Sequence, residues 1–269
     1  MLNVAWKSVL TPTIEEQRVT RIAWVTGAGK GIGRQVSLEL AKEGWLVAAS
    51  ARTISDLSSL VREAHPLQGS IREFAVDVTD EKRVREILYI IEDNLGPIDL
   101  AILNAGTYLR FGVAEFSVKS FSKQWDINVM GTVNSFVQIV KKMKDRETGH
   151  IVVVSSLSAY RGLPLASAYG ASKAALTNMC EALKPELEDF NINLSVVHPG
   201  FVRTPLTDRN EFPMPFLIEV DDAARRIIKG IKGGQFEITF PIPFVLIMKV
   251  FRWLPYSIYF AITRRLVRK

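Results

Sequence analysis

Two side chains that could exchange a proton stand one helical turn apart in this sequence. Tyr169 and Lys173 are four positions apart within 166–188, a stretch whose pattern predicts a single helix. Because side chains at positions i and i+4 lie on the same helix face, this phenol and this ammonium can touch. The same spacing is also common in ordinary surface pairs, so other parts of the chain must decide between a surface pair and a reactive one.

The chemistry available to such a pair is acid–base catalysis of carbonyl reduction. Hydride transfer to a ketone leaves an alkoxide that must be protonated, and the reverse reaction needs a base. A free tyrosine has a pKa near 10, which is too high for a base at neutral pH. A cation about 4 Å away is worth roughly 4 kcal/mol at an effective dielectric constant of about 20. We therefore expect Lys173, helped by the positive charge of an oxidised nicotinamide, to lower the pKa of Tyr169 by a couple of units.

A glycine-rich segment between a predicted strand and a predicted helix could bind a diphosphate. The segment TGAGKGIG occupies 26–33. Gly27, Gly31 and Gly33 would let the backbone turn tightly and approach a pyrophosphate, and the free N–H groups at the helix start favour an anion. Three glycines alone also suit an ordinary turn. In this strand–turn–helix setting they indicate a dinucleotide site.

The end of the second predicted strand indicates which nucleotide would bind. An acid at this place usually binds the adenosine ribose hydroxyls, whereas an arginine accommodates a 2′-phosphate. The sequence has Arg52 here and no acid at the strand end. Arg52 and Lys30 could both reach a 2′-phosphate, although each alone could equally be a solvated surface charge. Two cations without a carboxylate favour NADP(H) over NAD(H).

Short apolar segments alternate with longer helical patterns along the chain. The predicted strands cover 21–26, 45–51, 71–76, 98–103, 150–155, 192–197 and 235–240, and the predicted helices cover 34–43, 54–63, 80–94, 117–144 and 166–188. Strands that are apolar throughout and separated by crossover helices predict an α/β fold of the Rossmann type. We expect a doubly wound, mostly parallel sheet flanked by helices, with ligands beyond the carboxyl ends of its strands.

These motifs together resemble the short-chain dehydrogenase/reductase family over about residues 21–240. The family's TGxxxGxG falls on 26–33 and its YxxxK on 169–173. The resemblance implies an NADP(H)-dependent oxidoreductase that acts on a carbonyl or a secondary alcohol. The implied catalytic residues are Asn128, Ser156, Tyr169 and Lys173.

The resemblance also implies individual roles. Ser156 would hydrogen-bond the substrate carbonyl oxygen, Lys173 would also hold the nicotinamide ribose, and Asn128 would support a water chain from the lysine to solvent. One departure is Leu103, which stands at a strand end where the family's NNAG motif has its first asparagine. The implied cofactor-binding residues are Gly27, Lys30, Gly31, Ile32, Gly33, Arg52, Asp77, Val78, Asn104, Ala105, Gly106, Tyr169, Lys173, Pro199, Gly200, Val202 and Thr204.

The positive charge of the chain is concentrated at its C-terminal end. The chain has 34 basic and 28 acidic residues, a net charge of +6, and residues 241–269 hold six of the basic residues and none of the acidic ones. The remainder is formally neutral, which argues against a nucleic-acid partner. The three histidines and the single cysteine are scattered, so we predict no metal site and no internal disulfide, as suits a cytoplasmic protein.

Residues 241–269 form an apolar, basic C-terminal segment that permits three interpretations. The charge-free run 238–248, which leads into this segment, has eleven residues, whereas about 20 are needed to span a bilayer. Aromatic and basic side chains together suit a helix at a membrane interface. The segment could instead close the substrate pocket or pack against a second subunit. We place peripheral membrane contact first because neither alternative requires the charge excess.

We therefore predict one domain with two extensions. Residues 1–20 would be an N-terminal extension, 21–240 the NADP(H)-binding oxidoreductase domain, and 201–220 within it a substrate lid. The large apolar residues of the lid favour a hydrophobic lipid-, steroid- or ketone-like substrate, and the resemblance implies a homodimer or homotetramer joined through 117–144 and 166–188. The competing interpretation is a catalytically silent NADP(H)-binding sensor or scaffold, which the four intact catalytic positions disfavour.

Overall fold

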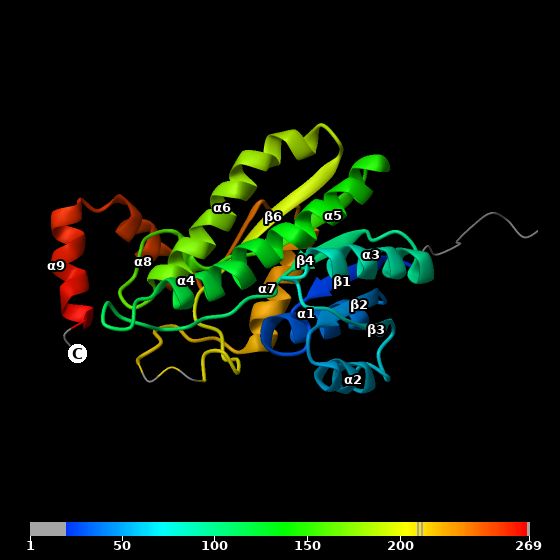
Figure 1. Cartoon of the computed structure of the whole chain (residues 1–269), viewed down its shortest axis with the longest axis horizontal. Coiled ribbons are helices and arrows are strands. Elements are labelled where there is room, and N and C mark those ends of the chain that lie inside the picture. The colour runs from blue at the N-terminus through cyan, green and yellow to red at the C-terminus, as the bar shows by residue number, and fades with distance from the viewer. Residues whose placement is uncertain (1–19, 209, 211, 268–269) are drawn as a thin grey trace, which may run out of the picture.

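The computed structural model describes residues 20–208, 210 and 212–267, which form a seven-stranded sheet with helices on both faces (Figure 1). Nearly all of the predicted N-terminal extension lies outside the described residues. The strand order is β3-β2-β1-β4-β5-β6-β7, and every adjacent pair is parallel. The Rossmann-type prediction is thereby confirmed. The strands are β1 (Ile22–Thr26), β2 (Leu46–Ala51), β3 (Ser70–Ala75), β4 (Leu100–Leu103), β5 (Gly149–Val154), β6 (Ile192–Pro199) and β7 (Glu237–Phe240).

The helices begin and end close to the predicted positions over most of the domain. Two of them have a side-chain N-cap: the Asp80 carboxylate accepts from the Arg83 backbone N–H at 3.0 Å, and the Ser117 hydroxyl accepts from the Ser120 backbone N–H at 3.2 Å. The helices are α1 (Gly31–Lys42), α2 (Ile54–Glu63), α3 (Glu81–Leu95), α4 (Val118–Trp125), α5 (Gly131–Asp145), α6 (Ser167–Glu188), α7 (Val220–Lys232), α8 (Ile242–Trp253) and α9 (Tyr256–Val267).

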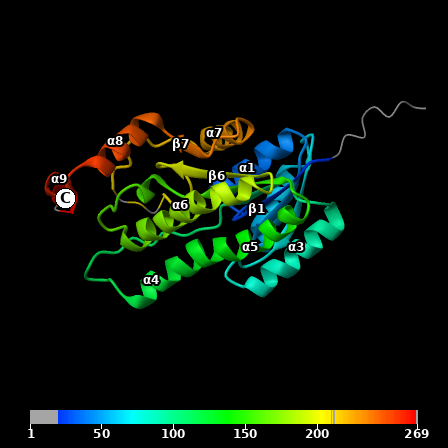
Figure 2. The same ribbon diagram turned by 90° about the horizontal axis from the view of Figure 1, so that it is seen from above.

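The strands are apolar because both faces of the sheet are covered. All five residues of β1 are buried, and their side chains alternate between two hydrophobic cores. Val25 belongs to the core shared with α1, α2 and α7, whereas Trp24 belongs to the core shared with α3, α5 and α6. Figure 2 shows α1 and α7 on one side of the sheet and α3, α5 and α6 on the other. The same covering holds the loops at the carboxyl edge of the sheet in place.

Cys180, the single cysteine of the chain, lies on α6 inside the second of these cores. Its side chain is fully buried, and burial raises the pKa of its thiol to about 12.

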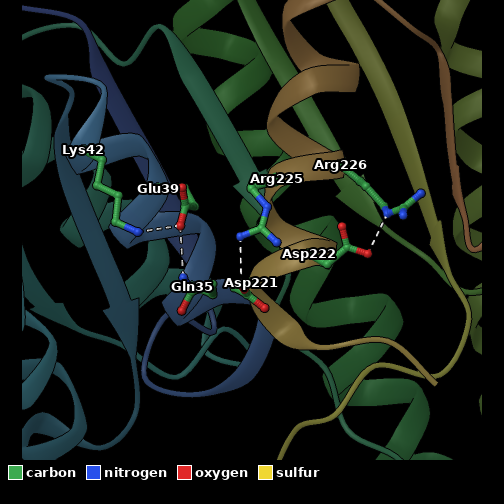
Figure 3. A network of polar contacts seen from close by, with 7 residues as sticks. All are labelled: Gln35, Glu39, Lys42, Asp221, Asp222, Arg225 and Arg226. Atoms are coloured by element: carbon green, nitrogen blue, oxygen red, sulfur yellow. Dashed lines mark hydrogen bonds and ion pairs between the residues drawn. The ribbon is translucent and has the colours of Figure 1, made fainter.

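Two elements differ from the prediction. The helix predicted over 117–144 is interrupted by one π-helical turn, Asp126–Met130, between α4 and α5. Helix α7 was not predicted at all. Its first turn carries Asp221 and Asp222, which pair at 2.8 and 2.9 Å with Arg225 and Arg226 one turn later, as Figure 3 shows. These i,i+4 pairs, in this orientation, support an isolated helix.

The C-terminal segment forms two helices instead of the single interfacial helix expected. Leu254 has an extended backbone (φ −64°, ψ 136°) because the following Pro255 disfavours a helical residue before it. Helix α8 packs back onto the domain, where Val245 and Met248 join Leu157 and Tyr160 in a third apolar cluster. Among the described residues, no helix has the length and hydropathy required to cross a membrane.

Candidate functional site

The predicted site residues meet at the carboxyl edge of β1, β4 and β5. The hydroxyl of Thr26, at the end of β1, accepts from the backbone N–H groups of Asn104 at 3.0 Å and Ala105 at 3.1 Å. The Asn104 amide in turn donates to the carbonyl of Thr26 at 3.1 Å and to that of Gly27 at 3.3 Å. Thr26 therefore positions two predicted cofactor residues, a role that the motif alone did not indicate.

The glycine loop requires glycine for two separate reasons. Gly27 and Gly31 have φ values of +66° and +57°, which favour glycine. A Cβ on Gly33 would lie 2.4 Å from Nδ2 of Asn104, and one on Gly31 would lie 3.2 Å from Cγ2 of Thr204. No side chain caps the start of α1, so its first N–H groups, which have no partner within the helix, are available to an anion. The loop therefore fits a dinucleotide diphosphate.

Arg52 and Asp77 line one cavity together with residues from the π-helical turn, among them Ile127 and Met130. Arg52 is exposed. The Asp77 carboxylate accepts from both the backbone N–H and the hydroxyl of Thr79, at 3.0 and 2.9 Å. The structure thus brings two predicted cofactor residues from the ends of neighbouring strands to one place.

Lys30 forms an ion pair that the sequence interpretation missed. Its ammonium lies 3.2 Å from the carboxylate of Asp56, which belongs to the first turn of α2. A Cβ on Gly29 would lie 3.1 Å from Cβ of Asp56, so this acid adjoins the glycine loop. Asp56 was overlooked because it comes after the end of β2 in the sequence. Its charge partly offsets that of Lys30, one of the two cations on which the NADP(H) prediction depends.

Tyr169 and Lys173 lie on one face of α6, with Nζ of the lysine 5.8 Å from the centroid of the tyrosine ring. The expected lowering of the phenol pKa, to which an oxidised nicotinamide would contribute, stays a prediction. Desolvation raises the pKa of Tyr169 to about 12, and the Ser156 hydroxyl, as its hydrogen-bond partner, opposes this rise. The ring of Tyr108 contacts Tyr169 edge-on at a centroid distance of 5.0 Å. Burial, which the sequence does not show, is the largest cause of this rise.

Lys173 is buried and its ammonium donates to the Val154 carbonyl at the end of β5, at 2.8 Å. Burial lowers the pKa of this amine to about 8. The backbone carbonyl of Lys173 accepts from the hydroxyls of Ser155 at 2.9 Å and Thr177 at 3.0 Å. These contacts fix the middle of α6 against β5 and hold the lysine beside the tyrosine.

Asn128 lies in the π-helical turn, and its fully buried amide joins two parts of the site. Its Oδ1 accepts from the Thr107 N–H at 2.7 Å, and its Nδ2 donates to the Thr107 carbonyl and to the Ser172 hydroxyl, both at 3.0 Å. The Ser172 hydroxyl donates to the backbone carbonyl of Tyr169 at 2.7 Å. Asn128 therefore ties the loop after β4 to α6, and the expected water chain stays a prediction.

Gly106 is the point where these groups converge. A Cβ placed on it would lie 3.3 Å from Oδ1 of Asn128 and 3.5 Å from Nζ of Lys173. Ser156 follows β5 and caps the short 3-10 turn Leu157–Ala159, where its hydroxyl accepts from the Ser158 N–H at 3.2 Å. The four predicted catalytic side chains thus come from three parts of the fold, the π-helical turn, the end of β5 and α6, to one end of the sheet. Such a set can hold a carbonyl oxygen and exchange a proton with it.

Comparisons with known proteins agree with this arrangement. The family model for the short chain dehydrogenases matches residues 21–212. A protein of Myxococcus xanthus (strain DK1622), described as an uncharacterized oxidoreductase, is 35% identical over 246 residues, which cover 91% of this chain and 97% of that protein. The structure of ElxO with NADP bound is 28% identical with a TM-score of 0.73, covering 82% of this chain and 97% of that one.

A further solved structure shares the fold. A short chain dehydrogenase/reductase from Burkholderia phymatum, in complex with NAD, has a TM-score of 0.79 at 21% identity and covers 86% of this chain and 92% of that one. The two structural neighbours thus carry different nicotinamide nucleotides. The match of the family model and the identity to the Myxococcus protein establish that this chain belongs to the short-chain dehydrogenase family of oxidoreductases.

Proposed function

We propose that the protein is an NADP(H)-dependent oxidoreductase that interconverts a carbonyl and a secondary alcohol on a hydrophobic substrate. The observation that carries this proposal is the convergence of Asn128, Ser156, Tyr169 and Lys173 next to a glycine loop that fits a diphosphate. A chain serving only as a silent NADP(H) sensor or scaffold would not need the buried lysine, whose placement in the core costs free energy.

Each side chain has a distinct task in this reaction. NADPH, when bound, supplies the hydride. Ser156 holds the substrate oxygen, and the Tyr169 hydroxyl gives its proton to the developing alkoxide. The pKa of about 12 keeps this phenol protonated at neutral pH, which suits the direction of reduction. Lys173, beside the ring, stabilises the phenolate that is left.

The preference for NADP(H) rests on Arg52 and Lys30. Arg52 is exposed at the cavity that Asp77 also lines, and an exposed guanidinium can bind a 2′-phosphate through two parallel hydrogen bonds. Lys30 contributes less than the sequence suggests because Asp56 lies 3.2 Å away. Thr204, another predicted cofactor residue, lies next to Gly31 of the glycine loop.

The surroundings of the site favour a hydrophobic substrate. Within the proposed lid, Phe201 and Phe212 contact each other at a centroid distance of 6.0 Å, and Arg110 lies over the Phe212 ring at 4.8 Å. We also propose a cytoplasmic homodimer or homotetramer joined through α5 and α6, with peripheral membrane contact through residues 241–269. Exposed Met130 and Val137 leave apolar surface on the π-helical turn and α5 for a second subunit.

Replacing Tyr169 by Phe tests the proposed reaction. The Tyr169→Phe variant should lose NADPH-dependent reduction of a panel of hydrophobic ketones by at least about a hundredfold, because the proton donor is gone. NADPH binding, measured by fluorescence titration, should stay nearly unchanged. Tyr89→Phe, an exposed position on α3, is the matched control. Retained turnover in Tyr169→Phe would refute the assignment.

A further inference from the structure

One face of helix α8 is buried against the domain, and the opposite face is exposed. Val245 and Met248 are buried against the domain, at 4% and 1% exposure. Leu246, Val250 and Trp253 are exposed by 60%, 59% and 84%. Large apolar side chains on an unpartnered helix face indicate a surface that binds something apolar. We call these three residues, together with the exposed apolar residues of α9, the outer face.

The buried face of α8 adjoins the catalytic segment. Val245 and Met248 pack with Leu157, the residue that follows Ser156. At the start of the helix, the ring of Phe244 stacks on that of Phe201 at a centroid distance of 5.4 Å and lies 6.4 Å from that of Phe216. Phe201 and Phe216 belong to the proposed lid, so α8 separates the outer face from the proposed substrate side of the domain.

Helix α9 extends the same apolar surface. Its exposed apolar side chains are Tyr256, Ile258, Phe260 and Ile262. Arg161 holds α9 to the domain: its guanidinium lies over the rings of Tyr256 and Tyr259 at 4.5 and 4.6 Å and donates to the carbonyls of Arg252 and Leu254. In both views α8 and α9 form one end of the molecule, opposite α3 (Figures 1 and 2).

The charges around the outer face identify its partner. Arg252, Arg264 and Arg265 are exposed, and residues 241–269 contain no acidic residue. A second copy docked through the same face would place like charges together, because a two-fold interface pairs a surface with itself. An anionic bilayer offers both partners that this surface lacks, an apolar interior and negative headgroups.

We propose that the outer face of α8 and α9 docks on an anionic lipid bilayer and that α8 lines the route by which a carbonyl substrate dissolved in the bilayer reaches the catalytic residues. The substrate part of this inference rests on the proposed function. The docking part deepens the peripheral membrane contact proposed above and does not depend on the oxidoreductase activity. Because an α-helix with its side chains is about 10 Å thick, the bilayer surface would lie one helix diameter from the segment that carries Ser156.

Docking is tested with the full chain and vesicles of phosphatidylcholine with or without phosphatidylglycerol. The unchanged protein should sediment with the phosphatidylglycerol vesicles, and less so at high salt. Leu246→Ser with Val250→Ser should weaken this binding by at least about tenfold. Ile54→Ser with Tyr89→Ser, exposed positions on α2 and α3, is the matched control and should bind unchanged.

The contribution of the positive charges to docking is tested with a second variant and its matched control. Arg264→Gln with Arg265→Gln should reduce binding to phosphatidylglycerol vesicles, whereas Lys82→Gln with Arg85→Gln removes the same charge from exposed positions on α3 and should not. Equal sedimentation of the α8 variant and its control would overturn the docking proposal. So would a change of oligomer size on gel filtration in the α8 variant alone, because it would show that a second copy covers this face.

The substrate route is tested with two ketones, one soluble in water and one with a long chain held in the vesicles. The α8 variant should reduce the soluble ketone as fast as the unchanged protein and the vesicle-held ketone about tenfold more slowly. Equal loss with both ketones would overturn the route. Absence of turnover with every ketone would refute both the proposed function and the substrate route. The docking proposal would still be tested separately by vesicle sedimentation.

Discussion

At the scale of single residues, the two titratable groups of the site are both shifted toward their neutral forms. Burial raises the pKa of Tyr169 to about 12 and lowers that of Lys173 from 10.5 to about 8. In the unfolded chain the lysine keeps its proton up to about pH 10.5. Between pH 8 and 10.5 the lysine therefore binds its proton more fully in the unfolded state, and the contribution of Lys173 to the stability of the fold should rise with pH across this window.

Lys173→Met should for this reason stabilise the protein while abolishing turnover. Near pH 7 the folded protein bears the full cost of a buried ammonium, so the variant should gain about 1–2 kcal/mol in free energy of unfolding after loss of the hydrogen bond to Val154. The gain should vanish as the pH rises from 8 to 10.5. Urea unfolding at pH 7 and pH 10 measures this, with Lys82→Met as control. An equal difference at both pH values would contradict it.

Asp56→Asn tests how far this acid weakens the preference for NADP(H). Removing the carboxylate frees Lys30 for a 2′-phosphate, so NADPH should bind about threefold more tightly, with NADH almost unchanged. Glu63→Gln is the matched control, because Glu63 is also on α2 and pairs with Arg34 of α1. Dissociation constants for both nucleotides give the answer. Equal tightening for NADH would show that the 2′-phosphate is not involved.

The sequence identified which residue types meet at this site, and the structure brings them together. It could not show their ionisation, because desolvation depends on what the whole fold packs around Tyr169 and Lys173. It also missed Asp56 and Tyr108. Neither residue belongs to a motif, although Tyr108 follows Gly106 by two positions, so spacing along the chain gives no signal for them.

At the scale of elements, periodicity located the strands well because each is apolar over its whole length. The helical pattern over 117–144 gave no sign of the π-helical turn, whose buried Asn128 bonds to the distant residues Thr107 and Ser172. Such an interruption serves tertiary contacts and is not encoded by local propensity. Helix α7 was not predicted because the segment before it was interpreted only as a lid.

Arg161 should control how firmly α9 stays on the domain. Arg161→Ala removes two ring contacts and two hydrogen bonds to α8 and its end, so α9 should open about tenfold more often. Hydrogen exchange of the α9 amides should be faster, and that of β1 and β4 unchanged. Arg83→Ala, which removes a surface pair with Glu86 on α3, is the control. Unchanged exchange in α9 would show that other contacts hold it.

At the scale of the whole molecule, the fold class could be predicted from the sequence, but the way in which the C-terminal segment closes one end of the fold could not. Composition shows that 241–269 is apolar and basic. Only the fold shows that part of this segment completes an apolar cluster around Leu157 and Tyr160. One segment can therefore serve the domain and its surroundings together, so pocket closure and membrane contact are not exclusive alternatives.

Two truncations should separate these roles. A chain ending at Phe240 loses Val245 and Met248, so it should be less stable by several kcal/mol and should lose turnover of the soluble ketone. A chain ending at Leu254 keeps α8, so it should retain most of the stability and most of the turnover of the soluble ketone. Thermal unfolding and turnover of the soluble ketone measure this. Equal stability of the two chains would contradict the role of α8 in the domain.

The enclosed sulfhydryl of Cys180 has a practical consequence for such studies. It is the single thiol in the sequence, fully buried in α6 and protonated at neutral pH, so maleimide reagents should leave the native chain untouched. A cysteine introduced at any exposed position would then be the one reactive handle. Spin labels or fluorophores can be attached there without first engineering a cysteine-free background.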